Sequence, residues 1–313
     1  DEVYAAGREL LTPEFKDEFF CDVRIILATA GYDEFRKSKT TKYTNDTIKY
    51  AKDSIAYLES GNSCKAYGYQ KWGYANKEDA LGWLHYNIGY LYTFDKNDLK
   101  EGANYMYKVS QMKAVAAKDA AVYASFTKYY IPQLNAEVKK LQELPTPGDT
   151  EAEDTAKPKA EAIKAQTALI RGLADRIMET LAQTYARIDN TPAQKTFKDG
   201  VMSQFKDAYG TRFNTKDTAP AAGMIATYGA RPVANPSTPV APIVEEPTAT
   251  TTTPAATTTG ATTKPVGSTT KPVAPMTKPV APATKPATPP ATKPAPGTGT
   301  RPGVAKSKKA VKR

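Results

Sequence analysis

The sequence predicts an all-α protein followed by a long disordered tail, and three observations support this. Apolar residues recur at three- and four-residue steps through most of residues 1–217, as they do along one face of a helix. No stretch of useful length alternates apolar and polar residues, the pattern typical of a half-buried strand. From about residue 218 the chain becomes rich in proline, threonine, alanine and lysine. We therefore expect about seven or eight helices before the tail.

Changes in composition divide the chain into four parts. Residues 1–145 are expected to form a helical-repeat domain, and residues 146–158 an acidic linker that begins with a proline- and glycine-rich stop. Residues 159–217 are expected to form long C-terminal helices that pack on this domain. Residues 218–313 are the extended tail.

The first two helices are predicted from their start signals. Residues 12–14 place a capping hydroxyl, a proline and an acidic residue in succession, which is typical of a helix start. This helix is expected to end near Gly31, and the basic residues 36–42 to form a loop. A second helix then opens at Asn45 or Thr44.

Residues 76–112 predict two antiparallel helices joined by a short polar turn. Asn76 can cap the first helix, and Asp98 followed by Glu101 resembles a capping box at the start of the second. Small residues would let the two helices approach closely: Gly89, Gly102 and Ala103.

The central pair also resembles one tetratricopeptide repeat. The resemblance rests on Ile88-Gly89-x-x-Tyr92 in the first helix and on Glu101-Gly102 with Met106 and Val109 in the second. A looser second copy lies at residues 114–144, so the likeness covers about one to two repeats. It implies antiparallel helix pairs stacked as a bundle or solenoid, with a protein partner bound in a groove between pairs. The alternative is a generic helical bundle.

The remaining helices follow the same pattern. Residues 114–130 and 133–144 predict another pair, with Pro132 as the break between them. A long helix is expected from about Pro158 to Asp189. A last helix opens with Pro192 and is expected to stop at Gly210.

The tail carries the net charge of the protein. From Pro220 onward twelve Lys or Arg residues are opposed by two Glu, and this surplus of ten equals the net charge of the whole chain. Lys-Pro recurs every seven residues from Lys264 to Lys285 within the unit Thr-Lys-Pro-Val-Ala-Pro. Such a segment has too little apolar surface to order itself, so we expect an extended polyproline-II-like spacer.

The basic tip of the tail is a candidate contact for an anionic polymer, a lipid surface or nucleic acid. The residues expected to make this contact are Lys306, Lys308, Lys309, Lys312 and Arg313. The threonines of the tail could instead carry O-linked sugars, as in a stalk. A solubilising tether without a partner is the remaining alternative.

Two cysteines and the first residue bear on localisation. Cys21 and Cys64 predict one disulfide, with two buried thiols as the alternative. The chain starts at Asp1 without a methionine, which we interpret as removal of a secretory signal. No apolar run approaches the roughly 20 residues of a membrane-spanning helix. The expected address is therefore exported: periplasmic, cell-envelope or extracellular.

An aromatic, glycine-rich stretch at residues 66–75 is the best candidate site. Its rings could stack on sugars, bases or a protein, or they could simply cover a tyrosine-rich core. The candidate partner-binding residues are this stretch and three residues of the following helix: Tyr67, Tyr69, Trp72, Tyr74, Trp83, His85 and Tyr92.

The sequence offers no catalytic, metal or cofactor site. His85 is the one histidine, so a nucleophile–histidine constellation would depend on it. One histidine and two cysteines cannot build the common zinc sets, and no glycine-rich phosphate motif is present. We therefore expect no enzyme, no cofactor and no metal.

Three functions remain as hypotheses. The first is a non-catalytic exported scaffold or binding module that docks a protein partner through its helix pairs and is tethered by its basic proline-rich tail. The second is a structural subunit of a multi-copy cell-envelope or extracellular assembly. The third is nucleic-acid binding through the tail, although the folded part is nearly neutral.

Overall fold

The computed structural model describes residues 1–12 and 18–244. The described part is helical and contains no strand. Its elements in chain order are α1 (Glu2–Leu10), α2 (Phe20–Ser38), α3 (Thr44–Glu59), the short 3₁₀ helix η1 (Gln70–Trp72), α4 (Lys77–Phe94), α5 (Leu99–Ser110), the 3₁₀ helix η2 (Val115–Lys118), α6 (Ala120–Glu143), α7 (Glu153–Ala186), α8 (Pro192–Phe213) and α9 (Ala221–Gly229). The predicted all-α class is confirmed for these residues.

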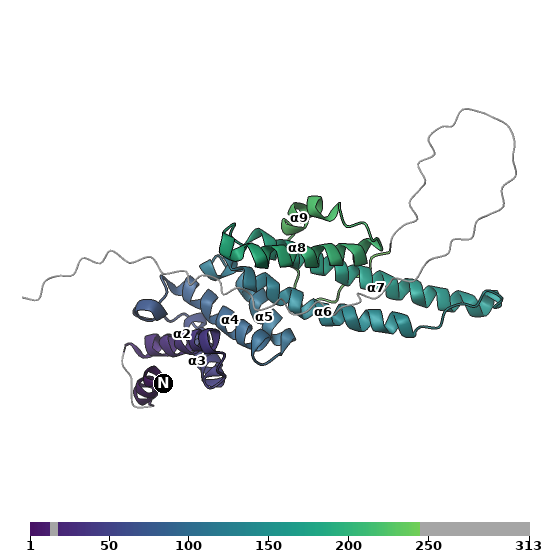
Figure 1. Ribbon diagram of the computed structural model, residues 1–313. Helices are drawn as coiled ribbons and strands as arrows, with labels where there is room; N and C mark the ends of the chain where they lie inside the picture. Colours follow the sequence, from purple (N-terminus) through teal and green to yellow (C-terminus); the bar gives the residue numbers. More distant parts are fainter. Residues whose placement is uncertain (13–17, 245–313) are drawn as a thin grey trace, which may run out of the picture.

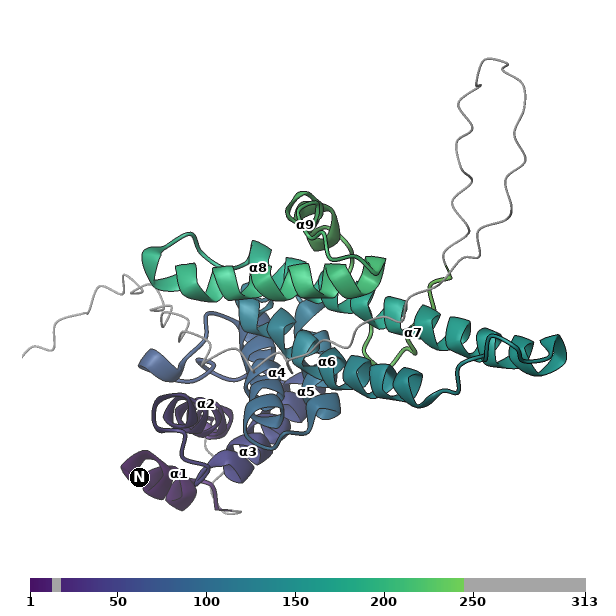
Figure 2. The ribbon, with the colours of Figure 1, turned by 45° about the vertical axis from the view of Figure 1, so that its right-hand side comes forward.

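The helices pack as consecutive pairs. α2 lies against α3, α4 against α5 and α6 against α7, while α4 also contacts α2 and α6. α1 covers α2 at the N-terminal end, and α8 and α9 both lie on α7 (Figure 1). The far ends of α6 and α7 extend beyond the other helices in both views (Figures 1 and 2). One large cluster of buried side chains runs through α2–α9, and a small second cluster joins α1 to α2 and α3.

The central α4–α5 pair forms as its caps and glycines predict. The Asn76 side chain accepts a hydrogen bond from the Asp79 N–H, and Asp98 accepts one from the Glu101 N–H. A Cβ atom added to Gly89 would lie 3.2 Å from the Gly102 carbonyl oxygen, so the two helix backbones nearly touch. Larger residues at this crossing would force the helices apart.

One predicted helix end is wrong because a tertiary contact overrides the local signal. α2 continues through Gly31 to Ser38, so the first three residues of the expected loop at residues 36–42 belong to the helix. Gly31 instead serves packing, because a Cβ there would overlap the hydroxyls of Tyr4 and Thr47. The expected helix start at residues 13–14 lies outside the described residues.

α6 is one helix where two were predicted. It runs through Pro132 without interruption. The proline removes one backbone hydrogen bond, but α6 packs on both α5 and α7, and this burial holds the helix together. In the same way α8 passes Gly210 and ends at Phe213, followed by Asn214, which adopts the left-handed conformation of a helix C-cap.

The C-terminal helical part begins earlier and ends later in the sequence than composition indicated. α7 begins at Glu153, inside the predicted acidic linker. Beyond residue 217, where the tail was expected to begin, α9 packs on α7, and residues 230–244 return along α7. The Ile243 N–H donates to the Ala168 carbonyl at 2.8 Å. Residues 245–313, with the Lys-Pro repeat and the basic tip, lie outside the described part.

Among the helices that the structure describes, none combines the length and apolar character that crossing a lipid bilayer requires.

Candidate functional site

The segment between α3 and α4 is tied to α2 by a disulfide. Cys21 in α2 and Cys64 in the segment are bonded, with their Cα atoms 5.3 Å apart. Both residues are buried in the main core cluster. The predicted Cys21–Cys64 disulfide is thus confirmed, and the segment is fixed at its start.

A buried carboxylate holds the next residues. Asp22 is only 3 % exposed and accepts backbone N–H bonds from Lys65 at 3.2 Å, Ala66 at 3.0 Å and Gly68 at 2.8 Å. Hydrogen bonds to an ionised acceptor are stronger than neutral ones. Three such bonds converging on one side chain therefore fix the backbone path of residues 65–68.

The backbone then adopts conformations that side chains rarely take. Tyr67 has φ +51° and Gln70 φ +49°, in the left-handed region that is costly for residues other than glycine. Gly68 between them has φ +102°, and a Cβ there would overlap the Trp72 carbonyl. The Tyr74 N–H donates to the Tyr67 carbonyl at 3.0 Å and closes the loop. Local strain of this kind persists only where surrounding contacts enforce it.

The loop and the residue before α2 present aromatic rings, two of which carry a lysine. Tyr69 is 63 % exposed, the highest value among the large apolar side chains of the described residues. The half-buried Trp72 ring carries Lys71 Nζ at 4.3 Å from its centroid, and Phe19 carries Lys65 Nζ at 4.6 Å. We call Phe19, Lys65, Tyr69, Lys71 and Trp72 the loop surface.

Other predicted residues support the loop from below. Tyr74 is half-buried, its hydroxyl lies 2.8 Å from Thr29 Oγ1, and its ring stacks with Trp83 at 6.5 Å. Burial raises the pKa of Tyr74 to about 12. Tyr67 packs against the core in the same way. These residues position the loop rather than face a partner.

His85 and Tyr92 lie elsewhere. They lie on a different face of α4 from Trp83, the face that packs against α3 and α5. His85 is 1 % exposed, with Nε2 3.5 Å from Glu59 Oε1 and its ring 5.7 Å from that of Tyr105. Tyr92 stacks on Tyr105 and accepts from Lys52 Nζ at 3.1 Å. The seven predicted residues therefore form two groups, and the loop surface includes only two of them, Tyr69 and Trp72.

Acidification is expected to destabilise the protein through His85. Burial and the nearby Lys108 lower the pKa of His85, while Glu59 opposes them. The folded state thus keeps His85 neutral at a pH where the unfolded chain, with an ordinary pKa near 6.5, takes up a proton. Stability from this group is present above about pH 6.5 and is lost as pH falls below it. In urea unfolding between pH 7 and 5, wild type should lose more stability than His85→Gln, and equal losses would refute the effect.

The sequence reasoning did not find the residues that shape the site. Asp22 carries no sequence signal for its role, because its three donors come from a segment more than forty residues later. Phe19 and Lys65 were missed because only the fold brings them together. Lys71 lies within the predicted stretch at residues 66–75 but was not among the predicted site residues. In the described part of the chain, no group of three or more His, Cys, Asp or Glu residues could hold a metal ion.

Comparison with known proteins identifies no relative on which a function could be based. No protein-family model, curated protein or solved structure matches the chain.

Proposed function

We propose that this chain is an exported, non-catalytic binding module that docks a protein partner on the loop surface. One observation carries the proposal. An exposed tyrosine and a half-buried tryptophan sit on a backbone that is strained at Tyr67 and Gln70, yet held rigid by a disulfide and by Asp22. A rigid loop presents its rings to a partner without an ordering cost on binding.

The chemistry of the loop surface fits a protein with acidic groups. Tyrosine and tryptophan are the residues that most often dominate binding energy at interfaces. Lys71 lies over the Trp72 ring, so a partner that brings a carboxylate there would gain charge complementarity as well as contact area. Lys65, over Phe19, already pairs with Glu18. Binding of this kind needs no catalytic group.

The packing of the helices behind the loop supports the interpretation of the fold as tetratricopeptide-like. The helices pack as successive pairs. The first helix of each pair contacts the first helix of the next, α2 with α4 and α4 with α6. Gly89 and Gly102 allow the close approach within the central pair. A disulfide is typical of oxidising compartments and supports export. In this proposal the tail tethers the module to an anionic surface through Lys306–Arg313.

Replacing Tyr69 and Trp72 with alanine is expected to weaken partner binding at least about tenfold, because each ring would be an interface anchor. The protein is purified natively from its source, and its mass and stoichiometry are measured by light scattering and intact mass spectrometry. Wild type should carry a partner chain at fixed stoichiometry.

The matched control is Tyr57→Ala, which removes a tyrosine of α3 that is 37 % exposed and lies outside the loop surface. It should bind like wild type. Equal binding by all variants would refute docking on the loop surface. Large assemblies of this chain alone, lost in the Tyr69→Ala and Trp72→Ala variant, would instead favour a structural subunit of an envelope or extracellular array.

A further inference from the structure

Residues 231–244, which we call the strap, follow α9 and lie across α6 and α7. The strap is anchored at its first residue. Arg231 Nη1 lies 2.8 Å from Asp175 Oδ2 and 3.2 Å from Glu179 Oε1, and its guanidinium lies 3.8 Å from the Tyr228 ring centroid. Gln183 Nε2 also donates to the Arg231 carbonyl at 2.7 Å. This anchor holds the start of the strap on α7 whatever its later residues do.

The middle of the strap meets α6 and α5 through few polar contacts. The Tyr129 hydroxyl donates to the Pro236 carbonyl at 3.3 Å. Ser237 Oγ donates to Asn104 Oδ1 at 3.1 Å, while Thr238 is exposed. Position 237 therefore uses a hydroxyl, and position 238 is free to vary.

The next four residues, Pro239–Pro242, meet α7 through the Val240 side chain and the Ala241 carbonyl, while the other three side chains are exposed. A Cβ on Gly172 would overlap the Ala241 carbonyl oxygen and would lie 3.2 Å from Val240 Cγ1. Gly172 thus opens a shallow groove in the helix surface, and the Val240 side chain packs on the main core beside it. The Ile243 N–H bond to the Ala168 carbonyl follows directly.

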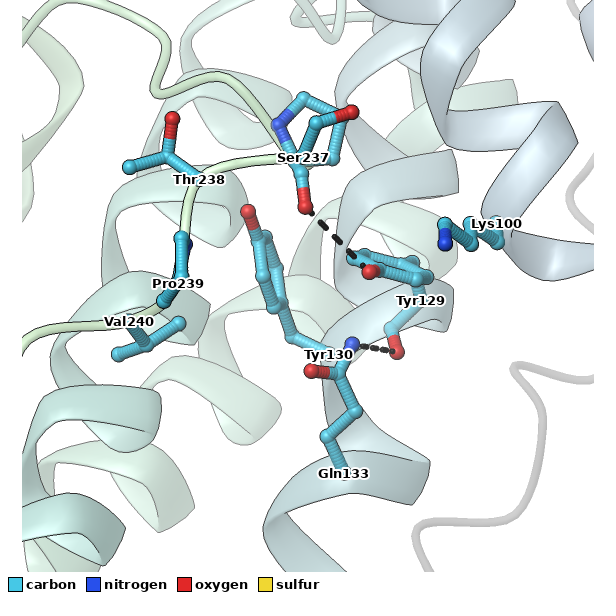
Figure 3. A pocket seen from close by; sticks show the side chains of 9 residues that line it. Lys100, Tyr129, Tyr130, Gln133, Ser237, Thr238, Pro239 and Val240 are labelled. Carbon is cyan, nitrogen blue, oxygen red and sulfur yellow. Dashed lines mark hydrogen bonds between the residues drawn. The ribbon is translucent and has the colours of Figure 1, made fainter.

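The contact between the strap and α6 is incomplete. A cavity of about 230 Å³ remains between it and α6, lined by Lys100, Tyr129, Tyr130 and Gln133 (Figure 3). Tyr130 is 2 % exposed and points its hydroxyl towards the strap, without a hydrogen-bond partner among the described residues. A buried hydroxyl without a hydrogen-bond partner is destabilising. The strap is therefore an imperfect ligand for its own site.

The sequence contains two further copies of the docked segment. Ser237–Pro242 reads Ser-Thr-Pro-Val-Ala-Pro, and residues 270–275 and 277–282 both read Thr-Lys-Pro-Val-Ala-Pro. Pro-Val-Ala-Pro, which includes the two positions that contact α7, Val240 and Ala241, is identical in all three. The first position keeps its hydroxyl, and the lysine replaces Thr238. Both changes fall at exposed positions of the strap.

We propose that the groove formed by α6 and α7 around Gly172 is a binding site for the Thr-Lys-Pro-Val-Ala-Pro sequence, and that the chain's own copies at residues 270–275 and 277–282 exchange there with Ser237–Pro242. Extended proline-rich peptides are recognised by aromatic-lined grooves because they lose little entropy on binding. The groove here offers Tyr129 and Tyr130. Exchange would move the docked position along the chain by 33 or 40 residues, the sequence distances from Pro239 to Pro272 and Pro279.

The two copies differ in the residues that flank them. The first copy is followed by Met276, an apolar residue at the place of Ile243. The second is preceded by Met276, at the place of the buried Pro236, but is followed by Ala283. Each copy therefore keeps one of the two apolar flanks of the strap. Tethering to the same chain raises their effective concentration to the millimolar range for short linkers, which favours the chain's own tail over a second molecule.

The test is photo-crosslinking in the full-length chain, with a photoreactive residue at Gln133 in the cavity wall. Wild type should crosslink mainly to residues 236–242. Val240→Asp should weaken the strap and move the crosslink at least tenfold towards residues 270–282, because its charge would lie on an apolar surface. Adding Val273→Asp and Val280→Asp should abolish the tail crosslink. Circular dichroism checks that each variant remains helical.

Gly172→Ala is the variant that closes the groove, and Gly200→Ala in α8 is its matched control, since a Cβ at Gly200 meets no atom within 4 Å. The first should lower crosslinks to both segments at least tenfold, and the second should leave them unchanged. Absence of a tail crosslink in Val240→Asp, or its persistence after Val273→Asp and Val280→Asp, would overturn the proposal. Mixing ¹⁵N-labelled and unlabelled chains completes the test: mixed crosslinks would assign the site to the tail of a second copy and overturn exchange within one chain.

Discussion

Replacing both Cys21 and Cys64 with alanine is expected to lower the free energy of unfolding by about 4 kcal/mol. The disulfide closes a loop between residues 43 positions apart, and its removal increases the conformational entropy of the unfolded chain. The loss is large compared with the 5–15 kcal/mol of a typical domain. It is measured by urea or guanidinium unfolding of the oxidised wild type and the double variant.

Reduction of the bond provides the control for this prediction. Dithiothreitol should lower the stability of wild type to that of the double alanine variant and should leave the variant unchanged. Both sulfur atoms are buried in the core, so a difference between the reduced wild type and the variant would measure the packing of the side chains. A double variant as stable as oxidised wild type would contradict the entropic role of the disulfide.

Replacing Asp22 with alanine is expected to cost about 3 kcal/mol, since it leaves one buried and two part-buried backbone donors without their acceptor. The amides of Lys65, Ala66 and Gly68 would lose their partner at once. The loop should also become mobile, so hydrogen exchange at Ala66 and Gly68 should accelerate well before global unfolding. Partner binding through Tyr69 should weaken with it, because the ring would no longer be held in place.

Two matched variants separate this role from a general effect of charge. Glu34→Ala removes an exposed carboxylate from the same helix and should change stability by no more than about 0.5 kcal/mol. Asp22→Asn keeps one acceptor oxygen and should fall between wild type and Asp22→Ala. Equal stability of Asp22→Ala and Glu34→Ala would show that the carboxylate does not hold the loop.

The fold class and the central helix pair were predictable because they depend on neighbouring residues. Apolar spacing and the caps at Asn76 and Asp98 act within one or two turns of the chain, and the structure shows both. Helix ends were less predictable, since Gly31 and Pro132 carry local signals that packing overrides. The energy of burying a continuous helix face exceeds the cost of one poor helix former.

The candidate site was predictable only in part. Its aromatic and glycine residues stand together in the sequence, and the cysteine pair could be proposed from its number and context. The division of the seven predicted residues between two sides of α4 could not be predicted, since it depends on which helices cover α4. The end of the folded part was missed for a similar reason: Arg231 meets Asp175, and Ala241 meets Gly172, only after α9 has turned the chain back along α7.

By itself, the sequence determined the helical class, the pairing of the central helices and the cysteine pair, because these follow from periodicity, capping and residue type. Only the tertiary structure decided that Asp22 holds the loop surface, that His85 lies apart from it and that residues 231–244 belong to the folded part. The physical reason is range. Helix formation is governed by contacts three or four residues apart, whereas buried donors, acceptors and grooves are completed by residues that only packing brings together.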